Sequence, residues 1–210
     1  MSKITSTEQE QSTMHRVSLF DQSMCVLNFQ DHFANKEQIS RVVNDIAQTS
    51  MNANNYHHTS VYQSPPGLQM NNVFDCLLHS PEMQEFVQLK SQELIIPAEK
   101  YLVCDNMWVT FIPPGGMLRS KENEGVFFGS YFLHSPADSG MITVESLTPS
   151  SYFRKFGNVQ NNEHNHNVRA FNMPEASIFL LPSYLKVGTT TNTSEEVAVQ
   201  INFTLDIVDR

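Results

Sequence analysis

The clearest pattern in the chain is a series of short apolar runs in its second half, separated by turns rich in Pro, Gly or Asn. Apolar runs of this length, bounded by turn residues, are typical of β-strands. Strands are predicted over residues 106–112, 126–134, 141–146, 177–181 and 197–207. This layout predicts an α+β protein whose core is a jelly roll, or double-stranded β-helix, with helices packed on one face.

Two helical patterns precede most of these strands and predict an N-terminal helical layer over about residues 36–102. The first covers about 36–48, where a capping box is followed by a single apolar stripe. The second begins at Ser80-Pro81, because a capping hydroxyl followed by proline is typical of a helix start. Its pattern continues to residue 102, with a break near Pro97.

The polar and apolar composition predicts one folded domain behind a polar tail. Residues 1–16 are rich in Ser, Thr, Gln and Glu and cannot bury enough apolar surface to fold by themselves. Residues 17–210 are predicted to form a single jelly-roll domain, since a chain of 210 residues with 40% apolar content can bury one sizeable core. Loops are expected at 50–72 and 157–172, which are rich in Asn and other polar residues.

The net charge and the number of cysteines argue against some classes of function and some cellular compartments. The formal net charge of -9 argues against a general nucleic-acid binder, which needs clustered Lys and Arg. Cys25, Cys76 and Cys104 are odd in number and widely spaced, and therefore predict reduced thiols in a cytosol-like compartment. No apolar run suits a secretory signal or a membrane span, so we expect a protein that is made and kept in soluble form.

Histidines are the natural candidates for a metal site. His164 and His166 would lie on one side of an extended segment and could hold a metal, although the sequence nominates no third ligand for them. An exposed loop pair is the commoner explanation of such a pattern. The adjacent His57 and His58 indicate a solvated loop, and His134 follows a predicted strand, where it is expected to be satisfied or exposed.

Several short motifs follow one another in a defined order. They are Trp108-Val109-Thr110, Gly115-Gly116, Phe128-Gly129-Ser130-Tyr131-Phe132, Leu181-Pro182-Ser183-Tyr184 and Gln200-Ile201-Asn202. In order and spacing the chain resembles a family of 2-oxoglutarate/Fe(II) oxygenases found in marine bacteria and tailed phages. That family's pattern runs Trp-x-Asn, a glycine turn, His-x-His-Pro, Ser-Gly-x-Tyr-Tyr, Phe-Pro-Ser-Trp-x-x-His and Arg-x-Ser-x-x-Phe-Asn. The resemblance covers nearly everything after about residue 17.

The resemblance implies that the iron and cosubstrate sites have been lost. It places the family's first two metal ligands at Ser120 and Glu122, and its distal histidine at Val187. Non-haem Fe(II) needs two histidines and a further ligand on one face of the metal, and of these residues only Glu122 could bind iron. The arginine that binds 2-oxoglutarate falls at Glu196, whose carboxylate would repel the cosubstrate. We therefore expect neither Fe(II) nor 2-oxoglutarate as a cofactor.

A chain that keeps the family's strand motifs but lacks its metal-binding and cosubstrate-binding residues is expected to be a non-catalytic pseudoenzyme. We expect it to act as a structural or assembly component. The phage-borne members of the family suggest a virion protein at a neck, tail or capsid surface, present in the host cytoplasm before assembly. Its partners would be other virion proteins and not nucleic acid or membrane, with homo-oligomers left open. The expected contact surfaces are the tail 1–16 and the loops 50–72 and 157–172.

Two alternatives remain open at this point. One is an active hydroxylase with a non-standard iron site, in which Glu122 is joined by a histidine from elsewhere. The histidines available for that role are His134, His164 and His166. A substitute for the missing arginine would be Arg119, Lys121 or Lys186. The other alternative is a jelly roll whose emptied pocket binds an apolar or sugar ligand.

Overall fold

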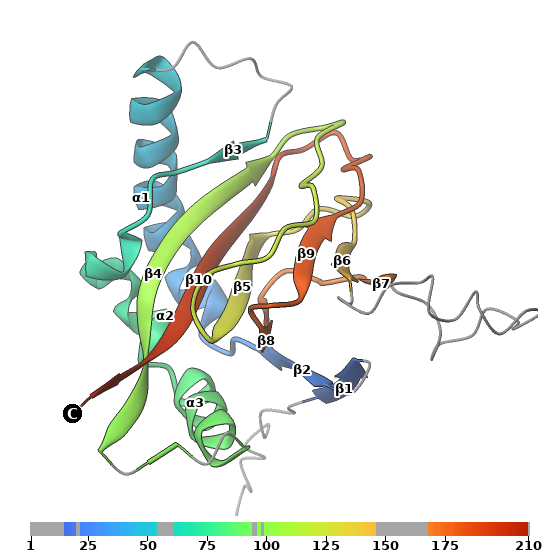
Figure 1. Cartoon of the computed structure of the whole chain (residues 1–210). Helices are drawn as coiled ribbons and strands as arrows, with labels where there is room; N and C mark the ends of the chain where they lie inside the picture. The colour runs from blue at the N-terminus through green and yellow to red at the C-terminus, as the bar shows by residue number, and fades with distance from the viewer. Residues whose placement is uncertain are drawn as a thin grey trace, which may run out of the picture.

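Two antiparallel sheets and a set of helices make up the computed structural model of the chain (Figure 1). The structure describes residues 15–19, 22–53, 61–93, 96–97, 99–145 and 168–209. The tail 1–14, the loop residues 54–60 and the stretch 146–167 therefore lie outside the described residues, together with His57, His58, His164 and His166.

The larger sheet has seven strands in the order β1-β2-β8-β5-β10-β4-β3. In that order the strands are β1 (His15–Leu19), β2 (Gln22–Asn28), β8 (Ser177–Pro182), β5 (Phe127–His134), β10 (Ala198–Asp209), β4 (Lys100–Ile112) and β3 (Tyr62–Gln63). The smaller sheet has the order β7-β6-β9. Its strands are β7 (Val168–Phe171), β6 (Ile142–Glu145) and β9 (Lys186–Thr189). The predicted α+β architecture is confirmed.

The helices are α1 (His32–Ala53), α2 (Asp75–Leu78) and α3 (Pro81–Glu93), with short 3-10 turns at Leu68–Met70 and Asn72–Phe74. The predicted start of α3 is confirmed, since the backbone N–H of Met83 donates to Ser80 Oγ at 3.1 Å. The predicted helix over about 36–48 is the central part of the longer α1. None of the described helices combines the length and apolar character that crossing a bilayer requires.

The expected continuation of the second helix to residue 102 is wrong. Helix α3 ends at Glu93, and β4 begins at Lys100, six residues earlier than the strand predicted from the sequence. The early start follows from pairing with the end of the chain, because Lys100 lies opposite Asp209 and Leu102 opposite Ile207 on β10. A ladder to a distant strand therefore overrides the local helical pattern.

Alternation along the strands of the larger sheet creates two apolar clusters, one on each face. The helix-side cluster packs α1 and α3 onto the sheet and includes Ile39, Val43, Phe86, Tyr131, Ile201 and Phe203. The cluster between the two sheets includes Phe128, Phe132, Val144, Phe179 and Val187, with Trp108 packed against it. The second cluster fills the inside of the jelly roll, which is where the resemblance predicts the lost site.

Candidate functional site

A small cavity lies between the two sheets, inside the jelly roll. Its volume is about 20 Å³, and its walls include Trp108, Phe128 and Phe179 on the apolar side and Gln200 and Asn202 on the polar side. A space of that size holds about one water molecule, whereas pockets for small ligands measure roughly 300–1,000 Å³. This cavity, as the described residues bound it, is therefore too small for a small-molecule ligand.

Aromatic side chains pack beside this cavity. The ring centroids of Trp108 and Phe128 are 6.1 Å apart, those of Phe128 and Phe179 are 5.8 Å apart, and those of Phe132 and Phe179 are 6.0 Å apart. Phe179 is fully buried and links the other rings from the centre of β8. Such rings contribute packing energy beyond their buried area, so the interior is held as a core.

A short polar chain crosses one wall of this interior. The Asn202 amide donates to Thr110 Oγ1 at 2.7 Å, and the Gln63 amide donates to the same oxygen at 3.1 Å. The Lys121 ammonium group donates to Gln63 Oε1 at 3.4 Å, which carries the chain outward to the solvent. These contacts satisfy the side chains of Asn202, Thr110 and Gln63 with one another.

The segment predicted to carry the first metal ligands lies beside β9. Lys121 and Val187 form an antiparallel bridge, and residues directly opposite each other in such a pair project their side chains to the same side. Arg119, Lys121, Asn123 and Val187 line the cavity, whereas Ser120 and Glu122 do not, and Lys121 is itself exposed to solvent. The barrel thus faces Lys121 and Asn123, one residue out of register with the positions Ser120 and Glu122 that the resemblance assigned.

The position assigned to the cosubstrate-binding arginine lies away from the cavity. Glu196 stands in the loop before β10, where its side chain is 67% exposed and its Oε2 lies 3.0 Å from Nε2 of His134. It is not among the residues that line the cavity. A carboxylate in this position cannot bind another carboxylate, and its own partner is a histidine.

The donor groups facing the cavity do not fit an iron site. Lys121 is cationic and repels a metal ion, Asn123 offers a neutral amide, and Val187 has no donor atom. Among the described residues, no group of three or more His, Cys, Asp or Glu side chains could hold a metal ion. We therefore derive no step through iron or 2-oxoglutarate.

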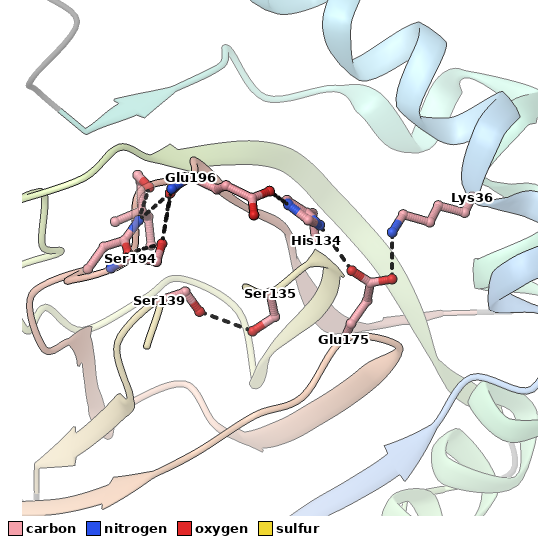
Figure 2. A network of polar contacts seen from close by, with 9 residues as sticks. Lys36, His134, Ser135, Ser139, Glu175, Ser194 and Glu196 are labelled. Carbon is pink, nitrogen blue, oxygen red and sulfur yellow. Dashed lines mark hydrogen bonds and ion pairs between the residues drawn. The ribbon is translucent and has the colours of Figure 1, made fainter. Parts of the chain in front are cut away.

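A second polar cluster gathers at one end of β5, around Glu175 (Figure 2). Glu175 lies in the turn between β7 and β8 and accepts from Lys36 at 2.5 Å and from His32 Nε2 at 3.0 Å on the same oxygen. Its other oxygen lies 3.0 Å from His134 Nδ1. Burial alone would raise the pKa of Glu175, but hydrogen bonds from Lys36, His32 and His134 outweigh it and lower the pKa to about 2.

The buried end of this cluster fixes the tautomer of His32. His32 is fully buried at the start of α1, and its Nδ1 lies 2.5 Å from the hydroxyl oxygen of Tyr131. Burial raises the pKa of Tyr131, with smaller contributions from Cys76 and Glu175, so the side chain stays a phenol. The Glu175 carboxylate only accepts, so Nε2 of His32 carries the proton that it donates to Glu175, and Nδ1 of the neutral ring accepts from the phenol.

His134, an alternative metal ligand in the sequence analysis, is occupied on both sides of its ring. Nδ1 and Nε2 each lie 3.0 Å from a carboxylate oxygen, of Glu175 and Glu196 respectively. A metal could bind either nitrogen only by displacing one of these contacts. Glu122 is exposed, and the other candidate histidines, His164 and His166, lie outside the described residues.

Cys76 and Cys104 are free thiols, as the sequence predicts. Cys25 is buried, and Cys76 and Cys104 are half-buried. Burial raises the pKa of Cys76, and burial with the nearby charge of Asp105 raises the pKa of Cys104 to about 12. Thiols with raised pKa values are poor nucleophiles at neutral pH, so these two do not suggest a catalytic cysteine.

The cluster around Glu175 could not be recognised from the sequence. Its contacts join residues 99 and 143 positions apart, between His32 and Tyr131 and between His32 and Glu175. The only local signal was the position of His32 at the start of an amphipathic helix, where a fully buried histidine needs a distant partner.

Solved structures that resemble this chain include a prolyl-4-hydroxylase and a protein with 2-oxoglutarate bound. A prolyl-4-hydroxylase from Pseudomonas putida has a TM-score of 0.54 and 10% identity over 88% of this chain and 93% of its own. HygX from Streptomyces hygroscopicus, solved with nickel and 2-oxoglutarate bound, has a TM-score of 0.54 and 11% identity over 87% of this chain and 82% of its own. These likenesses establish the double-stranded β-helix fold that the sequence predicts.

One further similar structure is longer than this chain. An oxidoreductase of the 2OG-Fe(II) oxygenase family from Burkholderia pseudomallei has a TM-score of 0.45 and 8% identity, and the match covers 62% of this chain and 55% of that one. No protein-family model matches the chain, and no curated protein sequence is significantly similar to it.

Proposed function

We propose that this chain is a non-catalytic, oxygenase-like jelly-roll protein that acts as a structural or assembly component of a tailed-phage virion, at a neck, tail or capsid surface. The supporting observation is the interior of the jelly roll, where Lys121, Asn123 and Val187 face a cavity of about 20 Å³. An enzyme of this fold needs ligands and space at that place, and both are replaced by packing and an amine.

The proposed partners are other virion proteins, with the host cytoplasm as the place of synthesis. This part of the proposal is supported by the resemblance to phage-borne members of the oxygenase family. The proposed contact surfaces 1–16, 50–72 and 157–172 have only a part within the described residues. That part includes Met70, whose side chain is 88% exposed and offers an adaptable apolar contact.

An anaerobic titration with Fe(II) and 2-oxoglutarate tests the proposal that the chain does not bind the metal and the cosubstrate. A ligand that binds the folded state at a hundred times its Kd stabilises a protein by about 2.7 kcal/mol and raises its melting temperature by several degrees. For this chain we expect no visible charge-transfer band and no rise in melting temperature. HygX is a suitable positive control, since its structure contains 2-oxoglutarate and a metal.

A saturable band with a rise in melting temperature would overturn the proposal in favour of the hydroxylase with a non-standard iron site. The virion role has a separate test, in which antibodies against the chain probe gradient-purified particles and the soluble lysate of infected cells. We expect the chain in the particles at a fixed ratio to the capsid protein, or bound to assembly intermediates. Its presence only as a free protein would contradict the virion role while leaving the loss of catalysis intact.

A further inference from the structure

The lining of the cavity between the two sheets carries positive charge and no negative charge. Arg119 and Lys121 both belong to it, and none of the other lining residues is Asp or Glu. The chain as a whole has a formal net charge of -9, so the charge of this lining is opposite in sign to that of the protein. A cleft lined by one sign of charge raises the local concentration of ions of the other sign. The lining therefore favours an anion.

Neither cation is neutralised within the part of the chain that the structure describes. The side chain of Arg119 is exposed and has no ion pair or hydrogen bond with any described residue. The Lys121 ammonium group donates at 3.4 Å to Gln63 Oε1, which is uncharged. A guanidinium and an ammonium group without a carboxylate partner keep N–H donors for charge-assisted hydrogen bonds to an anion.

Backbone hydrogen bonds hold the segment that carries the two cations against β9. Leu118 N donates to Thr189 Oγ1 at 2.9 Å, and Thr189 N donates to Leu118 O at 3.0 Å. Further along, Lys121 and Val187 form the antiparallel bridge described above. Arg119 lies between these two points of attachment, so the positions of both cations at the cavity are set by the backbone.

A buried amide without a partner lies on the wall that the larger sheet contributes. Gln200 on β10 is 6% exposed and lines the cavity, yet its side-chain amide forms no hydrogen bond with any described residue. Asn202, on the same face of β10, differs in that its amide donates to Thr110. Buried polar groups are nearly always hydrogen-bonded, because an unpaired one costs free energy. The amide of Gln200 therefore points to a bound group that accepts a hydrogen bond.

We propose that this cavity binds one small inorganic anion of the size of chloride, between Arg119 and Lys121 on one side and the Gln200 amide on the other. The volume of about 20 Å³ holds about one water molecule, which suits a monatomic anion and not phosphate or a dicarboxylate. Such an anion connects the segment beside β9 to β10 and so ties the two sheets together. The site does not depend on the proposed virion role.

Chloride itself is the probe, and sodium gluconate at equal ionic strength is the reference, because gluconate is too large for the cavity. The excess line width in chloride NMR measures exchange with a bound state, and the melting temperature measures the stabilisation that binding produces. For the wild type we expect a saturable excess line width and a higher melting temperature in chloride than in gluconate. Bromide should compete with chloride and quench the fluorescence of Trp108, the sole tryptophan of the chain, which lines the cavity.

Three variants locate the anion. Lys121→Gln should weaken chloride binding about fivefold, and adding Arg119→Gln should weaken it further. The matched control is Lys186→Gln, which removes a cation next to Val187 that does not line the cavity. Gln200→Met removes the amide but keeps the charges and the approximate shape, so it should weaken chloride binding and leave the melting temperature in gluconate unchanged or higher.

The proposal is overturned if the wild type shows no saturable line broadening by chloride. It is also overturned if Lys186→Gln weakens binding as much as Lys121→Gln does, since the effect would then be one of general surface charge. Chloride binding by Gln200→Met equal to that of the wild type would place the anion outside the cavity and would overturn it as well. Melting temperatures in gluconate show that each variant is folded.

Discussion

Lys121 and Val187 exchange two backbone hydrogen bonds, from Lys121 N to Val187 O at 3.1 Å and from Val187 N to Lys121 O at 2.9 Å. This pair fixes which side chains of the 120–123 segment face the inside of the jelly roll. Since Lys121 and Val187 project to the same side, the alternate residues Ser120 and Glu122 project away from it. The pairing therefore determines where a metal site could be built.

Grafting metal ligands onto the inward positions should create a metal site. We expect the variant Lys121→His/Asn123→Asp/Val187→His to bind Co(II) saturably, because it places two imidazoles and a carboxylate around the cavity. Visible absorption of bound Co(II) and isothermal titration calorimetry measure the binding. The matched control is Ser120→His/Glu122→Asp/Val187→His, whose first two substitutions face outward.

Overpacking of the interior costs about 1–3 kcal/mol, so circular dichroism must confirm that both grafted variants fold. Binding by the control variant alone would contradict the inward register of Lys121 and Asn123. Equal binding by both would show that the segment can shift by a residue against β9.

Glu175→Gln should lower the free energy of unfolding by about 2–3 kcal/mol, because Lys36 and two histidines lose the charge that they share. Urea unfolding at neutral pH measures this loss. The matched control is Glu37→Gln on the solvent side of α1, where the carboxylate pairs with Arg41 and is 80% exposed. An exposed pair of this kind is worth less than about 1 kcal/mol, so a similar loss in both variants would contradict the role of Glu175.

The same carboxylate predicts the acid stability of the protein. The folded pKa of Glu175 is about 2, below the ordinary value, so its contribution is fully present above about pH 4.3 and is lost as the pH falls toward 2. We expect the free energy of unfolding of the wild type to fall over this window more steeply than that of Glu175→Gln. Parallel curves for the two proteins would show that Glu175 is not held as an anion by its neighbours.

Tyr131→Phe should destabilise the protein by about 1–3 kcal/mol, because Nδ1 of the fully buried His32 loses its donor. Thermal and urea unfolding measure the effect. Tyr184→Phe is the control, since Tyr184 is 43% exposed and its hydroxyl can be replaced by water. A destabilisation of Tyr131→Phe no larger than that of the control would argue that Tyr131 does not set the His32 tautomer.

Substitution by alanine should have opposite effects on stability at Gly129 and Ser130, which are neighbours on β5. A Cβ at Gly129 would overlap Leu180 and Phe203 in the centre of the larger sheet, so Gly129→Ala should cost about 1–3 kcal/mol or prevent folding. Ser130 is fully buried, and its hydroxyl has no hydrogen-bond partner among the described residues. Ser130→Ala should therefore be neutral or stabilising in urea unfolding, and a large loss would reveal a partner for that hydroxyl.

The sequence predicted the bounds of most strands well, but it predicted only in part which residues lie around the cavity. The predicted strands 126–134, 141–146, 177–181 and 197–207 each lie within two residues of the observed elements at both ends. Short apolar runs between Pro, Gly and Asn are local features, and local features can be read without knowing what a strand pairs with. The motif spacing assigned the metal ligands to Ser120 and Glu122, whereas the residues of that segment that line the cavity are Arg119, Lys121 and Asn123.

What the sequence determined by itself was the α+β jelly roll and the start of α3 after its Ser80 cap. What only the tertiary structure decided was which side chains meet. The start of β4 depends on pairing with Asp209, the inward register of Lys121 depends on Val187, and the contact of His32 with Glu175 spans 143 positions. The periodicity of apolar residues encodes the kind of element and its buried face, whereas the partner across a sheet or at a helix end is set by how the whole core packs.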